Sequence, residues 1–122
     1  MSNKRIISCA ITGSLHTPSR SPYFVSKPQD LAQQAIDAAE AGAASVHIHA
    51  RNPENGAPSA DLAVFREIIE TIRAKSDVLI CITTGGGVGM TVEQRAAVVP
   101  EFKPELSSMN CGSINFGIFP LA

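Results

Sequence analysis

The sequence contains no tryptophan, one tyrosine and only three cysteines. Cys9, Cys81 and Cys111 are odd in number, widely spaced and without a CxxC pair. This pattern argues against both a disulfide-stapled scaffold and a cysteine-ligated zinc site. We expect these cysteines to be reduced, mostly buried thiols of a cytoplasmic protein.

The sequence also lacks an excess of charge and a long hydrophobic run. Its formal net charge is -1, which gives no electrostatic reason to expect a nucleic acid or an anionic membrane as partner. The apolar run from Ile6 to Ile11 is interrupted by Ser8 and is too short for a signal sequence or a membrane span. With 122 residues, of which 44% are hydrophobic, the chain is long enough for one modest core.

Two histidines lie two residues apart within an apolar, strand-like segment. Because successive side chains of a strand point to opposite faces, His47 and His49 share one face while Val46 and Ile48 share the other. Two neutral imidazoles on one face form a pair of ligands for a divalent metal, most plausibly zinc. The alternative is a polar strand end whose histidines bond to backbone or water.

Four apolar segments predict strands, and amphipathic segments between them predict helices. Residues with capping chemistry precede the three predicted helices: Ser26, Ser59 and Thr91. Gly42 and Pro100 are expected to end the first and the third helix. The predicted strands are Arg5 to Thr12, Ala44 to Ala50, Val78 to Thr83 and Leu106 to Asn110.

Alternating strands and helices predict an α/β fold with a parallel sheet. Polar, glycine-rich segments follow the carboxyl end of each strand, where α/β proteins place their active sites. The polar face of the second strand favours a (β/α)8 TIM barrel, which takes about 250 residues. We therefore expect residues 1–122 to be the N-terminal half of a single barrel domain that continues beyond Ala122 and is inactive by itself. Its open sheet edges favour a homo-oligomer or pairing with the remaining half.

A glycine-rich loop, Gly85-Gly86-Gly87-Val88-Gly89, follows the third predicted strand. It lacks a lysine at P-loop spacing, and Met90 occupies the third glycine position of a GxGxxG motif. The loop is either a cradle for a carboxylate or phosphate, formed by backbone N–H groups, or a tight turn between a strand and a helix. The hydroxyls of Thr83 and Thr84 favour the cradle.

Taken together, these motifs resemble those of the β-keto acid cleavage enzymes, a family that includes the 3-keto-5-aminohexanoate cleavage enzyme of lysine fermentation. The resemblance covers essentially the whole chain in order. It is carried by Cys9-Ala10-Ile11-Thr12-Gly13, His47-Ile48-His49-Ala50-Arg51, Gly56-Ala57-Pro58-Ser59, Thr83-Thr84-Gly85-Gly86-Gly87-Val88-Gly89-Met90-Thr91 and Asn110-Cys111-Gly112-Ser113-Ile114-Asn115-Phe116-Gly117.

The resemblance implies a zinc-dependent barrel that cleaves a small β-keto acid with acetyl-CoA, giving acetoacetate and a new CoA thioester. His47 and His49 match the family's zinc-binding histidines. Thr83, Gly86 and Ser108 match positions that bind the substrate carboxylate, with Ser107 as the alternative if the register differs by one residue. The family's third zinc ligand, a glutamate, and its catalytic aspartate and arginine come from later strands, and no residue of this sequence matches them.

The first loop departs from the lysine-fermentation enzyme, which carries there a glutamate for the substrate's ammonium group. Leu15 lies at or beside this position, so a neutral or anionic β-keto acid is expected, which His16 could contact. Two other functions stay open: a catalytically inert barrel fragment, and a barrel that binds phosphate or carboxylate without a metal.

Overall fold

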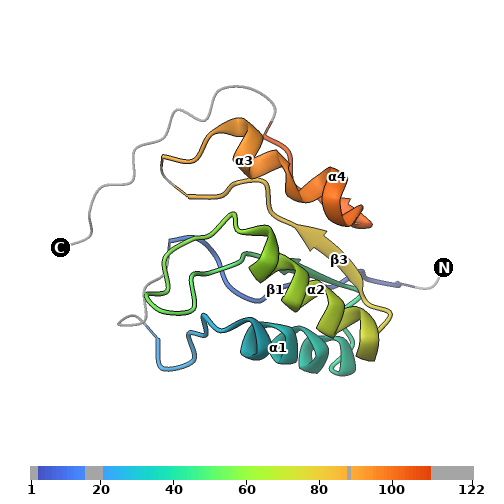
Figure 1. The fold of residues 1–122 in the computed structure, drawn as a ribbon. Helices are drawn as coiled ribbons and strands as arrows, with labels where there is room; N and C mark the ends of the chain where they lie inside the picture. The colour runs from blue at the N-terminus through green and yellow to red at the C-terminus, as the bar shows by residue number, and fades with distance from the viewer. Residues whose placement is uncertain (1–2, 16–20, 88, 111–122) are drawn as a thin grey trace.

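Four parallel strands form one sheet in the order β1-β2-β3-β4. The computed structural model describes residues 3–15, 21–87 and 89–110. Each strand lies beside the next one in the chain, and a helical segment connects each successive pair (Figure 1). The elements are β1 (Ser8–Ala10), α1 (Pro28–Glu40), β2 (Ser45–Ile48), α2 (Leu62–Lys75), β3 (Leu79–Ile82), α3 (Val92–Ala96), α4 (Val98–Phe102) and β4 (Leu106–Ser107). The predicted α/β class with a parallel sheet is confirmed.

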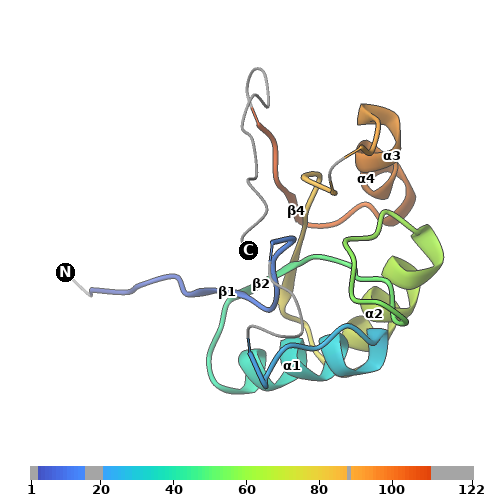
Figure 2. The same cartoon turned by 90° about the vertical axis from the view of Figure 1, so that its left-hand side faces the viewer.

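The helices lie along one side of the strands, as Figure 2 shows for α1, α2 and α4. Apolar side chains of β2 and β3 that face this side are 0–1% exposed, and α1 and α2 supply the residues that cover them. Together they form the core of the domain, which includes Leu31, Ala35, Val46, Ile48, Phe65, Ile68, Ile69, Ile72, Ile80 and Ile82. The alternate residues of β2 and β3 therefore face the side that these helices leave uncovered.

Two of the predicted helix caps are wrong. Ser26 makes no cap, because α1 begins after Lys27, with Pro28 in its first turn, where proline is tolerated. Asp61 rather than Ser59 caps α2 by accepting a hydrogen bond from Ala63 N. Ser59 acts one step earlier and accepts from Asp61 N.

The C-terminal end of the first helix and the start of the third follow the predictions more closely. Gly42, with φ of 103°, lies just beyond α1 and donates to Ala39 O. Thr91 and Gln94 form a reciprocal capping box at the start of α3. Pro100 is predicted to end this helix, but it lies within the first turn of α4. Backbone N–H groups in the first turn have no acceptor within the helix, so the missing N–H of proline costs no hydrogen bond there.

The first strand is shorter and more exposed than predicted. Only Ser8–Ala10 pair as a strand, and Ile6 and Ile7 are 88% and 59% exposed. β1 lies at an edge of the sheet, with β2 as its one strand neighbour among the described residues, so its side chains gain little cover. The other strands also end one to three residues inside their predicted bounds.

The cysteine prediction holds in part. Cys9 and Cys81 are free thiols, but both are half-buried rather than buried. Cys111, His16 and the motif residues 111–117 lie outside the described residues. Among the helices that the structure describes, none is both long enough and apolar enough to cross a membrane.

Candidate metal and carboxylate site

His47 and His49 lie side by side on the uncovered face of the sheet. Their Nε2 atoms are 3.1 Å apart, and the rings meet edge to face with centroids 4.9 Å apart. Strand alternation places both side chains opposite the core residues Val46 and Ile48. Two nitrogen ligands of one tetrahedral zinc ion, each at about 2.0–2.1 Å from the metal, are separated by roughly 3.3 Å. The spacing of the two Nε2 atoms therefore fits a shared ion.

The surroundings of both imidazoles favour the neutral ring. Burial lowers the pKa of His47 below its ordinary value. The pKa of His49 falls to about 4, first because of burial and then because of the neighbouring charges on His47 and Arg51. A neutral imidazole keeps a lone pair for a metal, so this electrostatic environment suits ligands.

The sulfur of Cys81 lies beside the other nitrogen of the first imidazole. His47 Nδ1 and Cys81 Sγ are 3.2 Å apart, which follows from the register because the two residues are direct neighbours on β2 and β3. Within the part of the chain that the structure describes, no three His, Cys, Asp or Glu side chains cluster closely enough to hold a metal. The two histidines are therefore an incomplete ligand set.

The hydrogen-bond ladder between the strands continues past their ends. It aligns the residues predicted to bind the substrate carboxylate with the histidines. Thr83 N donates to Ile48 O at 3.2 Å, and Ser108 N donates to Ile82 O at 3.1 Å. In a parallel ladder these bonds place Thr83 beside His49 and Ser108 beside Thr83. We call His49, Thr83 and Ser108 the cross-strand row. It lies on the uncovered face, at the carboxyl ends of three neighbouring strands.

The hydroxyl groups of this row are held by backbone contacts. Thr83 is 6% exposed, and its Oγ1 accepts from Gly85 N at 3.0 Å. Ser108 Oγ accepts from Thr84 N at 2.9 Å, and Thr84 Oγ1 donates to Ser108 O at 2.7 Å. Each accepting hydroxyl keeps its own proton for a further acceptor.

The alternative residue Ser107 lies on the other face of the sheet. It pairs in register with Ile82, a core residue that faces the helices and is fully buried. Residues adjacent across a parallel sheet share a face, so Ser107 points away from the histidines. This geometry favours Ser108 over Ser107 as the partner of Thr83.

Gly86 occupies a position where a side chain would be strained. Its φ is 55°, and a Cβ added there would lie 2.9 Å from both Met90 Sδ and Arg95 Cγ. Arg95 holds the segment that follows by donating from Nε and Nη2 to Met90 O, at 3.1 and 2.9 Å. The positive φ and the close approach of Met90 and Arg95 explain why a glycine suits this position.

Arg51 ties together the loops that follow β1 and β2, a role that the sequence did not reveal. Its side chain is 1% exposed, and it donates to Gly56 O at 2.9 Å and to Gly13 O. The guanidinium also lies 5.0 Å from the ring centre of Phe24. Burial lowers its pKa. Gly13 is thereby held beside the strand that carries the histidines, and the exposed Leu15 lies two residues further along the same loop.

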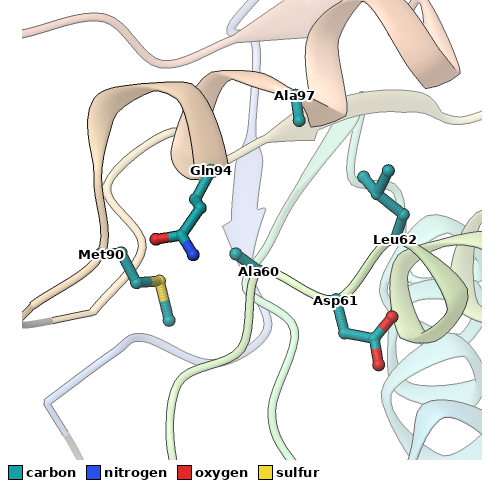
Figure 3. A pocket seen from close by; sticks show the side chains of 6 residues that line it. All are labelled: Ala60, Asp61, Leu62, Met90, Gln94 and Ala97. Carbon is teal, nitrogen blue, oxygen red and sulfur yellow. The ribbon is translucent and has the colours of Figure 1, made fainter.

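A separate shallow pocket of about 460 Å³ lies between the start of α2 and the start of α3 (Figure 3). Met90 lines it and also contacts the glycine loop, since Gly87 N lies 3.1 Å from Met90 Sδ. None of the predicted site residues lines this pocket. Its lining is Ala60, Asp61, Leu62, Met90, Gln94 and Ala97.

Several known proteins have sequences similar to this chain. The chain is 48% identical to "3,5-dioxohexanoate:acetyl-CoA acetone transferase" of Paraburkholderia graminis over 99% of its own length and 40% of that protein. It is 36% identical to "3-dehydrocarnitine:acetyl-CoA trimethylamine transferase" of Rhizobium meliloti, over 97% of this chain and 46% of the relative. It is 40% identical to "3-keto-5-aminohexanoate cleavage enzyme" of Fusobacterium nucleatum, over 96% and 43% respectively.

The chain thus spans less than half the length of these relatives. The family described as "beta-keto acid cleavage enzyme" matches residues 4–121, which is nearly the whole chain. This match includes both histidines, the glycine loop and Ser108. The chain therefore belongs to the beta-keto acid cleavage enzyme family.

Proposed function

We propose that the protein cleaves a β-keto acid with acetyl-CoA in a zinc-dependent reaction, giving acetoacetate and a CoA thioester. The observation that carries this proposal is the cross-strand row, in which the candidate zinc ligand His49 lies beside Thr83 and Thr83 lies beside Ser108, the two residues proposed to bind the substrate carboxylate. Neighbouring strands are about 4.8 Å apart, so the row spans roughly 10 Å. A small keto acid fits this length, with its keto oxygen toward the histidines and its carboxylate toward Thr83 and Ser108.

His47 and His49 would hold the zinc ion through Nε2. When bound, zinc supplies Lewis acidity at the keto oxygen of the substrate. Thr83 and Ser108 donate hydrogen bonds from their hydroxyl groups to the carboxylate, and the backbone of Gly86 binds it as well. These contacts orient the substrate, and orientation is one of the larger contributions to a reaction between two bound molecules. The third zinc ligand and the catalytic acid and base are expected from later strands of the whole protein.

The substrate we propose is a β-keto acid without an amino group. Leu15, which is 58% exposed, stands at or beside the position where the resemblance implies a glutamate for an ammonium group. The relative from Paraburkholderia, whose name denotes a dioxo acid, shares more identity with this chain than the relative named 3-keto-5-aminohexanoate cleavage enzyme does. Comparison of kcat/KM for 3,5-dioxohexanoate and 3-keto-5-aminohexanoate in the whole protein tests this preference. A higher value for the amino-substituted acid would refute it.

We further propose that residues 1–122 form the N-terminal half of a (β/α)8 barrel. The strands follow one another in sequential order without a reversal, as barrel strands do, whereas doubly wound sheets reverse at a switch point. The uncovered face then corresponds to the barrel interior. Turnover by a monodisperse 12.8 kDa chain in zinc-containing buffer would contradict this proposal.

Zinc binding by the 122-residue chain is the direct test of the metal site. We expect one weak site per chain, because two histidines without the third ligand hold zinc poorly. His47→Ala and His49→Ala should each abolish this site, while Gln33→Ala, on the exposed surface of α1, should leave it intact. Isothermal titration with zinc measures all four proteins. Unchanged binding in both histidine variants would rule out these ligands.

A further inference from the structure

We infer that Cys81 is a positioning residue that orients the His47 ring for metal binding by accepting a hydrogen bond from Nδ1–H. The inference rests on the proposed zinc function and adds to it a residue that is not itself a ligand. It starts from the 3.2 Å separation of Cys81 Sγ and His47 Nδ1.

The register of the sheet leaves Cys81 as the polar cross-strand neighbour of His47. The ladder places Ala10 on one side of His47 and Cys81 on the other. Ser45, two residues earlier on the same face, is already hydrogen-bonded through its hydroxyl to Ser8. The contact between ring and sulfur is thus set by the strand pairing and not by one side-chain rotamer alone.

The position of the other ring nitrogen, His47 Nε2, indicates which tautomer the contact with Cys81 favours. His47 Nε2 points at His49 Nε2, 3.1 Å away, so Nε2 is the atom available to a shared ion. A neutral imidazole that gives its Nε2 lone pair to a metal carries its proton on Nδ1. Cys81 Sγ is in place to accept that proton's hydrogen bond, as carbonyl or carboxylate oxygens do for many metal-binding histidines.

A matched control is present in the same sheet. Cys9 is also a half-buried free thiol, but it pairs in register with Val46 and packs against the core on the helix-covered face. Loss of its sulfur removes the same atom type from the opposite side of the sheet. An effect specific to the histidine pair should therefore appear at Cys81 and not at Cys9.

The experiment uses the 122-residue chain labelled with ¹⁵N-histidine. Nuclear magnetic resonance reads the tautomer of His47 without metal, and competition with a chromogenic chelator measures zinc affinity. In the wild type we expect His47 with its proton on Nδ1. Partners of this kind contribute about 10- to 100-fold to metal affinity, so Cys81→Ala should weaken zinc binding to a similar extent and shift the tautomer toward Nε2–H. The zinc affinity of Cys81→Ser, which keeps an acceptor, should stay within roughly threefold of the wild-type value. The zinc affinity of Cys9→Ala should equal that of the wild type.

Each outcome separates this inference from the proposed function. A wild-type His47 protonated on Nε2 would overturn the inference without any variant, as would unchanged zinc affinity and tautomer in Cys81→Ala. Equal losses in Cys81→Ala and Cys9→Ala, or in Cys81→Ala and Cys81→Ser, would overturn it as well. Absence of zinc binding in the wild type would refute the proposed metal site, while the tautomer would still decide the role of Cys81.

Discussion

Replacement of Thr83 by valine tests the proposed carboxylate site most directly. Valine keeps the β-branched shape that suits a strand end and removes only the hydroxyl group. In the structure this hydroxyl is buried and accepts from Gly85 N at 3.0 Å, which leaves its proton free for a substrate carboxylate. The substitution therefore removes one donor to a charged group from an otherwise unchanged face.

The magnitude follows from the energy of such a bond. A hydrogen bond to a charged group contributes about 1.5–3 kcal/mol, which corresponds to roughly 10- to 150-fold in kcat/KM. Part of any loss in stability would come from Gly85 N, which loses its acceptor, at about 1–3 kcal/mol if water cannot replace it. Gly85 is half-buried, so we expect the lower end of that range.

The assay is steady-state kcat/KM of the whole protein with a β-keto acid and acetyl-CoA, alongside zinc content and unfolding in urea. Thr83→Ser keeps the hydroxyl and drops the methyl group, so it should retain most of the activity. An unchanged kcat/KM in Thr83→Val would remove this residue from the site. Equal losses in the valine and serine variants would point to packing instead of the hydroxyl.

Two further predictions concern stability. Asp61→Ala removes the cap of α2 and should destabilise the chain by about 1 kcal/mol. Ser59→Ala should cost less, since the Ser59 hydroxyl accepts from Asp61 N and not from an N–H group within the helix. Urea unfolding compares the two variants, and the reverse order would refute the cap assignment. Glu105 has a lowered pKa: burial raises it, but the hydrogen bond from Ile80 N, its own backbone and the charge of Arg73 outweigh this effect. A carboxylate with a lowered pKa stabilises the fold above its unfolded pKa and loses this contribution as the pH falls through the folded value. Glu105→Gln should therefore be less stable than the wild type at pH 7, by about 0.2–1 kcal/mol for this exposed group, and the gap should close below pH of about 4; a constant gap across pH would contradict this reasoning.

The alternation of apolar strands with amphipathic helices was sufficient to predict the parallel α/β sheet. Buried strands appear in the sequence as short apolar runs, and helices buried on one side appear as apolar residues at helical spacing. Strand alternation likewise predicted that His47 and His49 share a face. The motifs predicted the family, which the match over residues 4–121 confirms. Residue types alone were a less reliable guide to which side chain caps a helix. Ser59 and Asp61 both have capping side chains, and only the path of the loop decides which one meets the first free N–H groups.

The tertiary structure decided which residues meet across strands, since register depends on pairings between segments that lie 25 to 37 residues apart in the chain. It placed Ser108 and not Ser107 beside Thr83, and it placed Cys81 beside His47. It also showed Arg51 holding two loops together, a contact to backbone carbonyls that leaves no pattern in side-chain types. The sequence by itself determined the elements and the chemistry they carry, because both are recorded locally. The arrangement of that chemistry into one row across three strands is a property of the sheet.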